Sequence, residues 1–193
     1  MPRITTTALA ILAMLIPALT AQAIIRKVPE QYSTIQAALD DAREGDIVLV
    51  APGNYAESLL VQRSVYLISE EPGAAVIDAD MDDAIRAEHL DGDMLQVIGF
   101  SIHNCRAGVV VIESSGAVVD TTISGCMPVD EYEDLISFNG SGDATVAHVV
   151  LTANETFDPA TIGLIGLYVD GQSVVTESVI SASNAAGMSL HGA

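Results

Sequence analysis

Short apolar runs separated by Gly, Asn and Asp make up most of the chain after residue 46. Ile47–Ala51, Leu59–Val61, Val65–Ile68 and Ala75–Ile77 are such runs, and each ends at polar or turn residues. Runs of this length and bounding composition are typical of β-strands. They are too short and too closely spaced for strand–helix–strand units, so we predict an all-β fold.

One helix is predicted ahead of these strands, over about residues 33–44. Ser33 and Gln36 have the spacing of a capping box, which places the start of the helix there. Gly45 is expected to end the helix in a left-handed conformation. Apolar residues recur at helical spacing and form one stripe: Ile35, Ala38, Leu39 and Ala42.

Two types of strand alternate along the chain from residue 97 onward. The first type ends at Ile102, Ile123, Leu151 and Ile180, and the second at Val111, Phe138, Val169 and Leu190. The two series interleave strictly, as the stacked coils of a solenoid do.

The spacing between these strands shows where the chain has extra residues. From the second type to the next first type the spacing is 12, 13 and 11 residues, whereas within a coil it is 9, 15, 18 and 10. The additions therefore fall in one connection and are expected as loops, Met127–Asp134 and Asn154–Ile162, on one side of the stack. A β-sandwich has no reason to confine its insertions in this way, so we predict a parallel β-helix.

Residues 28–57 carry a longer motif, Val-Pro-x-x-Tyr-x-Thr-Ile-Gln-x-Ala-Leu-x-x-Ala-x-x-Gly-Asp-x-Val-x-Val-x-Pro-Gly-x-Tyr-x-Glu. This motif resembles the start of secreted bacterial proteins of the pectin-lyase-like superfamily. The resemblance implies a right-handed parallel β-helix whose N-terminal end is closed by the helix, with Gly45-Asp46 opening the first coil. It implies a domain of residues 24–193 with stacked coils from residue 46 onward.

The resemblance leaves the activity open, because this superfamily holds lyases, hydrolases, esterases and epimerases. The Gln-Asp-Thr motif of its methylesterases and the Asn-Thr-Asp motif of its polygalacturonases do not occur in the chain. We therefore predict no catalytic residue.

The two predicted loops gather carboxylates around aromatic side chains. Such surfaces suit stacking on sugar rings, with calcium bridging to the carboxylates of an acidic sugar. Plain solvent-exposed loops are the alternative. The candidate ligand-binding residues are Asp130, Glu131, Tyr132, Glu133, Asp134, Glu155, Phe157 and Asp158.

Alternating carboxylates at Asp78, Asp80 and Asp82 also suit calcium, which prefers oxygen ligands. The stretch is not an EF-hand loop, because Asp83 stands at the sixth position and His89 at the twelfth. A solvated acidic turn between coils is the alternative. Calcium is the single cofactor that these patterns suggest.

The two cysteines follow the strand repeat. Cys105 and Cys126 each lie three residues after a first-type strand, so they are expected at equivalent positions on adjacent coils. Neighbouring strands are about 4.8 Å apart, which is within reach of a disulfide. A disulfide and a ladder of stacked small side chains, continued by Asn154 and Ser183, both fit this placement.

The first 23 residues have the layout of a secretory signal peptide. Arg3 precedes the apolar stretch Ala8–Ile16, and Ala21-Gln22-Ala23 forms the cleavage motif. Removal of residues 1–23, whose only charged side chain is Arg3, leaves 170 residues with a formal charge of −20. We therefore expect a periplasmic or extracellular protein with no membrane span after cleavage. Its charge disfavours nucleic acids and anionic membranes as partners.

Three functions fit these patterns. The first is a secreted β-helix protein that binds polysaccharide through its loop face and has no identifiable catalytic site. The second is a polysaccharide lyase or epimerase acting on acidic glycans, for which Arg106 is the cation nearest the loops. The third is a structural module of the cell envelope.

The last predicted strand, Met188–Leu190, would leave an unpaired edge at the end of the stack. Such edges pair with other chains, so we expect end-to-end self-association, which the charge of −20 opposes.

Overall fold

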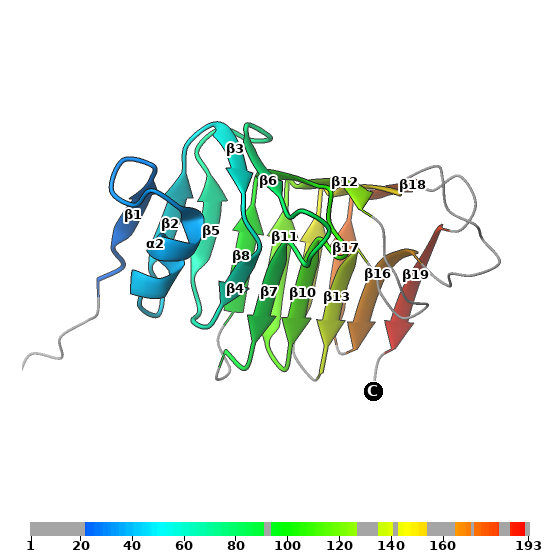
Figure 1. The fold of residues 1–193 in the computed structure, drawn as a ribbon. Coiled ribbons are helices and arrows are strands. Elements are labelled where there is room, and N and C mark those ends of the chain that lie inside the picture. The colour runs from blue at the N-terminus through cyan, green and yellow to red at the C-terminus, as the bar shows by residue number, and fades with distance from the viewer. Residues whose placement is uncertain are drawn as a thin grey trace, which may run out of the picture.

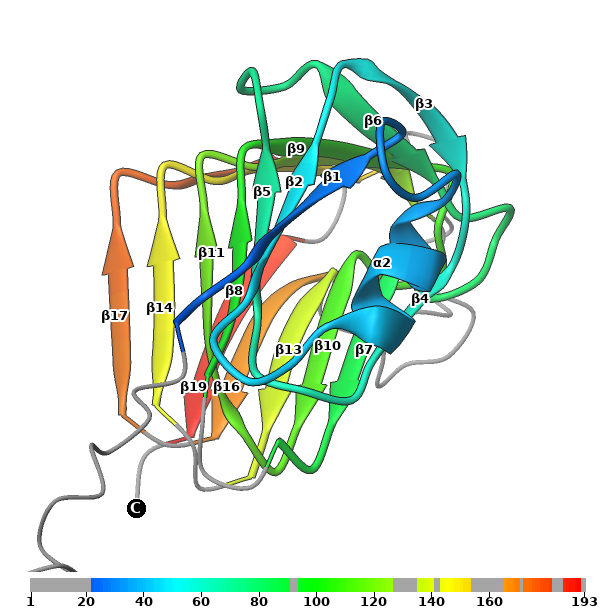
Figure 2. The ribbon, with the colours of Figure 1, turned by 90° about the vertical axis from the view of Figure 1, so that its left-hand side faces the viewer.

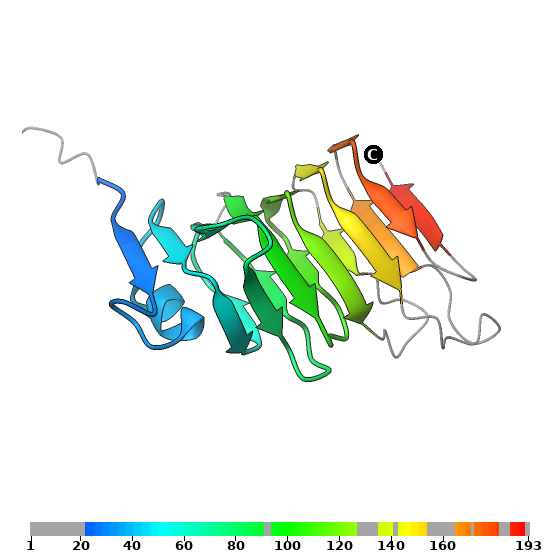
Figure 3. The same ribbon diagram turned by 90° about the horizontal axis from the view of Figure 1, so that it is seen from above.

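The computed structural model is a stack of parallel strands (Figure 1). It describes residues 22–90, 94–126, 135–140, 143–153, 165–170, 172–181 and 186–191. Seen from above, the strands follow one another along a single axis in chain order (Figure 3). Three parallel sheets, named A, B and C here, run along this axis and contain seven, six and six strands. The predicted parallel β-helix is confirmed.

Each coil contributes one strand to each sheet. Sheet A consists of β1 (Ile25–Val28), β2 (Ile47–Val50), β5 (Tyr66–Ser69), β8 (Met94–Ile98), β11 (Ser115–Val119), β14 (Ala144–Ala147) and β17 (Ser173–Thr176). Sheet B consists of β3 (Gly53–Ala56), β6 (Ala75–Asp78), β9 (Phe100–His103), β12 (Thr122–Cys126), β15 (Val150–Ala153) and β18 (Val179–Ser181). Sheet C consists of β4 (Leu59–Val61), β7 (Ile85–Glu88), β10 (Val109–Ile112), β13 (Ile136–Asn139), β16 (Ile165–Asp170) and β19 (Ala186–His191).

The core lies between the three sheets and is built from alternate residues of each strand. In β2, for example, Val48 and Val50 are fully buried while Ile47 and Leu49 face outward. Because parallel pairing aligns equivalent residues, Val48 lies next to Leu67 of the following coil. Each buried aliphatic side chain of this kind contributes about 1.5–3 kcal/mol.

The strand register predicted from the repeats is also found. Ile102, Ile123, Leu151 and Ile180 pair in succession within sheet B. Val111, Phe138, Val169 and Leu190 do the same within sheet C. Sheet A is a third strand type that the repeat pattern does not reveal, since its strands lie inside the connections of nearly constant length.

The helix, α2 (Ile35–Asp41), is shorter than predicted. Its N-cap is Thr34, whose hydroxyl oxygen accepts a hydrogen bond from the Ala37 N–H at 3.2 Å, so the capping box at Ser33 is wrong. Gly45 has the expected positive φ of 78° but lies beyond the helix, in the turn before β2. The helix N-terminus is completed by Glu57, whose carboxylate oxygens accept from the Ile35 and Gln36 N–H groups, each at 2.9 Å.

Helix α2 lies across the N-terminal end of the stack, against β1, β2 and β4 (Figure 2). Gln36 satisfies the free edge of sheet C there. Its side-chain oxygen accepts from the Leu60 N–H at 2.9 Å, and its NH2 group donates to the Leu60 carbonyl oxygen at 3.1 Å. The amide thus replaces the peptide group of a neighbouring strand.

A buried ion pair joins β1 to the start of the first coil. Arg26 Nη1 lies 3.0 Å from Asp46 Oδ2, and the two side chains are 6% and 3% exposed. Burial alone would raise the pKa of Asp46, but the N–H groups of Ile24 and Arg43 and the charge of Arg26 outweigh it and hold the pKa below its ordinary value. Asp46 is therefore charged in the folded protein at neutral pH.

Candidate functional site

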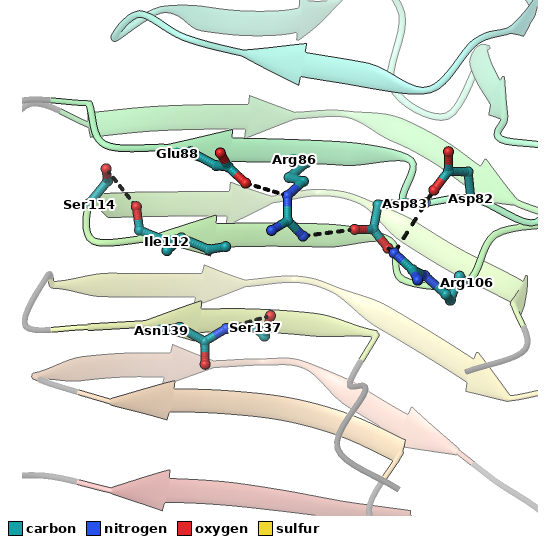
Figure 4. A network of polar contacts seen from close by, with 9 residues as sticks. All are labelled: Asp82, Asp83, Arg86, Glu88, Arg106, Ile112, Ser114, Ser137 and Asn139. Atoms are coloured by element: carbon teal, nitrogen blue, oxygen red, sulfur yellow. Dashed lines mark hydrogen bonds and ion pairs between the residues drawn. The ribbon is translucent and has the colours of Figure 1, made fainter. Parts of the chain in front are cut away.

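A cluster of charged side chains lies on the outer face of sheet C (Figure 4). Asp82 and Asp83 precede β7, Arg86 and Glu88 point outward from β7, and Arg106 precedes β10. All five belong to two neighbouring coils, since β7 and β10 pair in parallel. We call these residues the sheet C cluster.

Asp83 is the centre of the cluster. Its side chain is only 8% exposed and lies between two guanidinium groups. Asp83 Oδ2 is 3.1 Å from Arg86 Nη1, and Asp83 Oδ1 is 3.0 Å from Arg106 Nη2 and 3.1 Å from Arg106 Nε. The buried carboxylate therefore orients both arginines toward the surface at a fixed separation.

Arg86 is held from its other side by Glu88. Arg86 Nε donates to Glu88 Oε1 at 2.6 Å. This hydrogen bond, together with the one to Asp83, raises the pKa of Arg86 against the opposing effect of burial. Because the ordinary pKa of arginine is already above 12, Arg86 remains a cation and cannot serve as a proton acceptor.

The backbone beneath the cluster is fixed by contacts between coils. Arg106 N–H donates to the Asp82 carbonyl oxygen at 2.9 Å, and the Asp83 N–H donates to Asp82 Oδ1 at 2.8 Å. Cys105, directly before Arg106, forms a disulfide with Cys126 on the next coil, with a Cα–Cα distance of 4.3 Å. The site is therefore anchored on both sides of the coil boundary.

Three shallow hollows adjoin one another along β4. The central one, about 310 Å³, is lined by the sheet C cluster and by Ser58 and Leu60. Ser58 also lines a hollow of about 370 Å³ beside Glu57 and Asp78, and Leu60 lines one of about 390 Å³ beside Arg63 and Glu88. The shared residues make the three hollows one open groove.

Further polar groups continue the outer face toward the later coils (Figure 4). Arg86, Val110, Ser137 and Tyr168 are paired in succession, so they form one row along the stack. Beside this row, Asn139 Nδ2 donates to Ser137 Oγ at 3.3 Å. A ligand that extends along the axis would meet a regular series of side chains, one from each coil.

The three carboxylates proposed for calcium are not brought together. Asp78 Oδ1 accepts from Asn104 Nδ2 at 2.7 Å and from the Asp80 N–H at 3.2 Å, and these bonds lower the pKa of Asp78. Asp82 lies near Arg106 instead, at 3.9 Å. Among the residues that the structure describes, no three His, Cys, Asp or Glu side chains are placed to hold a metal ion. The acidic stretch is thus tied up in a hydrogen-bonded turn.

The predicted loop candidates lie outside the described residues. They are Asp130, Glu131, Tyr132, Glu133, Asp134, Glu155, Phe157 and Asp158. The segments that carry them join β12 to β13 and β15 to β16, that is, sheet B to sheet C. Asp82 and Arg106 belong to the same type of connection on earlier coils, so the described cluster and the predicted loops follow one corner of the stack.

Sequence analysis singles out Arg106 but not Asp83, Arg86 or Glu88. Asp83 and Arg106 are 23 residues apart, which is the length of one coil at this point of the chain. Opposite charges separated by one coil length are the signal that could have revealed the pair. The outward position of Arg86 and Glu88 follows from strand alternation once β7 is recognised.

Comparison with known proteins yields one partial similarity. The chain is 30% identical over 90 residues to a protein named "Cell surface glycoprotein" from Methanothermus fervidus, which covers 46% of this chain and 15% of that protein. The chain thus spans only a small part of that relative's length. No protein-family model and no solved structure matches the chain. Within the described segments, no helix is long and apolar enough to cross a membrane.

Proposed function

We propose that this chain is a secreted surface protein that binds carbohydrate along the outer face of sheet C. The predicted signal peptide and the similarity to a protein named as a cell surface glycoprotein support the location. The observation that carries the binding proposal is the sheet C cluster, in which fixed guanidinium and carboxylate groups line an open groove.

The chemistry of the groove suits sugar hydroxyls. A hydroxyl group both donates and accepts a hydrogen bond. Arg86 and Arg106 supply donors, and Asp82 and Glu88 supply acceptors, within one hollow and its neighbour. Hydrogen bonds to charged groups each contribute about 1.5–3 kcal/mol, so a few of them give measurable affinity without a deep pocket.

The charge balance favours a neutral glycan over a uronate. Two arginines face three carboxylates, Asp82, Asp83 and Glu88, so the cluster carries a net negative charge. A sugar carboxylate would meet this charge and that of the whole chain. The row along sheet C suits a linear polysaccharide, and Tyr132 and Phe157 of the predicted loops would add aromatic faces.

A polysaccharide lyase or epimerase requires a neutral base beside the sugar ring. Arg86 does not meet this need, because its raised pKa keeps it charged. We therefore propose binding without catalysis. A structural module of the envelope remains the simpler alternative, and it predicts no glycan ligand.

The test is retention of residues 24–193 on immobilised polysaccharides. The panel contains cellulose, xylan and mannan as neutral polymers and polygalacturonate and alginate as acidic ones, each with calcium and with chelator. We expect retention on a neutral polymer that does not depend on calcium, and no release of unsaturated products. Retention on none of them contradicts the proposal, and calcium-dependent retention on the acidic polymers alone contradicts the preference for a neutral glycan.

Matched variants locate the binding surface. Arg86→Gln removes the cation of the groove, whereas Lys27→Gln removes one from the outer face of sheet A. Loss of charged hydrogen bonds worth about 1.5–3 kcal/mol weakens binding about 10- to 150-fold in the first variant. Equal binding by the two variants would place the glycan elsewhere.

A further inference from the structure

The outer face of sheet A differs from the rest of the surface in being apolar. Leu49, Ile68, Ile98 and Val119 face outward from β2, β5, β8 and β11 and are paired in succession, so they form an aliphatic row along the stack. A second row beside it begins with Ile47 and Tyr66. Apolar patches of several hundred Å² on a soluble protein mark interaction sites.

This face also gathers exposed apolar side chains. Eight large hydrophobic side chains are exposed in the described part of the chain, and four of them, Ile25, Tyr66, Met94 and Val174, belong to sheet A. Each of the four is paired to an outward-facing residue of a neighbouring strand. The pattern is therefore a property of the whole sheet and not of one strand.

Charge is almost absent from this face. The outward side chains of the described sheet A strands include one charged residue, Lys27, whose ammonium group lies 3.2 Å from Glu30. Charges return at the two corners that flank the sheet. His148 lies 3.0 Å from both Asp120 and Glu177 at one corner, and His89 lies 2.9 Å from Glu113 at the other.

An apolar centre with a charged rim is the usual composition of a protein interface. We propose that two copies of this chain associate face to face through the outer face of sheet A. A copy with a formal charge near −20 repels another from most directions. The neutral face is where two such copies approach at the lowest electrostatic cost, and its lack of hydrogen-bonding groups makes it unsuited to sugar hydroxyls.

The size of the face predicts a reversible pair. Seven strands at about 4.8 Å spacing, each about 13 Å long, give a strip of roughly 29 by 13 Å, or about 380 Å² in projection. Stable interfaces bury about 800 Å² on each partner. The dimer is therefore expected in exchange with the monomer, and its population depends on concentration.

Salt should strengthen this association. The Debye length falls from about 10 Å at 0.1 M to 3 Å at 1 M, which screens the repulsion between two acidic copies and leaves apolar burial intact. An interface held by ion pairs would show the opposite trend. Sedimentation velocity of residues 24–193 at several concentrations and at both ionic strengths measures the dimer fraction.

Two substitutions to lysine separate this face from others. Tyr66→Lys places a charge on sheet A, and Val150→Lys places the same charge on the outer face of sheet B, at side chains that are 40% and 38% exposed. We expect Tyr66→Lys to weaken dimerisation at least tenfold and Val150→Lys to leave it unchanged. Circular dichroism checks that both fold, and Met94→Lys on the same face replaces Tyr66→Lys if that variant unfolds.

Three results would overturn the proposal. They are a wild-type protein that stays monomeric at 1 M salt, an equal loss in the Val150→Lys variant, and assemblies that persist in the Tyr66→Lys variant. The last result would assign association to the strand edge at Met188–Leu190.

Discussion

Replacement of Gly108 by alanine should destabilise the stack at the boundary between two coils. A methyl group at this position would lie 2.6 Å from Ile123 Cδ1, 2.8 Å from Ile123 Cγ2 and 2.9 Å from the Leu135 carbonyl oxygen. Ile123 is fully buried, and the Leu135 carbonyl accepts from the Gly108 and Val109 N–H groups at 2.9 and 3.0 Å. Neither neighbour can move away without breaking contacts between β10 and the next coil.

The expected magnitude follows from two opposing terms. Overpacking in a core costs about 1–3 kcal/mol, and the backbone contact places this case near 3. Replacing glycine by alanine returns about 0.4–1 kcal/mol through the unfolded chain. The net loss is about 2 kcal/mol, which lowers the melting temperature of a protein of this size by roughly 4–8 °C.

Gly53→Ala is the matched control for this prediction. The nearest atoms to a methyl group at Gly53 belong to the Tyr55 ring at 3.5 Å, an ordinary contact distance. This variant should be neutral or slightly stabilised. Thermal unfolding followed by circular dichroism compares the two, and equal melting temperatures would refute the close approach of coils at Gly108.

Three more changes have defined outcomes. Asp46→Asn should cost about 3 kcal/mol at neutral pH by leaving Arg26 without its buried partner. Because the folded pKa of Asp46 lies below its ordinary value of 3.8, the difference from wild type should be full above that value and shrink as pH falls through the lowered pKa, which urea unfolding at several pH values measures. Reduction of the Cys105–Cys126 disulfide, whose cysteines are 21 residues apart, should lower the unfolding free energy by about 3 kcal/mol, and the double serine variant should not respond to reductant. Gln36→Ala should cost about 1 kcal/mol and speed hydrogen exchange at the Leu60 amide, and an unchanged exchange rate would contradict its role at the sheet edge.

The register of two sheets could be predicted because one aliphatic or aromatic residue in each coil must face the core. Ile102, Ile123 and Leu151 recur for this reason, and they pair as the repeat predicts. Sheet A gives a weaker signal. Its strand β14 reads Ala-Thr-Val-Ala, and residues this small and mixed do not stand out from a turn.

The ends of the helix and the charged cluster depend on tertiary contacts that local patterns do not contain. Thr34 and not Ser33 caps α2, because Glu57 from β3's far end binds the first N–H groups of the helix. Asp83 meets Arg106 only because neighbouring coils are in register. Sequence spacing could predict such a pair only after the coil length was known.

Carboxylate labelling is the most direct test of carbohydrate binding at the sheet C cluster. Asp82 and Glu113 have similarly exposed side chains, 69% and 64%, but only Asp82 lines the groove. Carbodiimide labelling, read by mass spectrometry, would be compared with and without the polysaccharide that retains the protein best. The account predicts that bound polysaccharide protects Asp82 and leaves Glu113 unchanged, whereas equal labelling of Asp82 in both samples would contradict it.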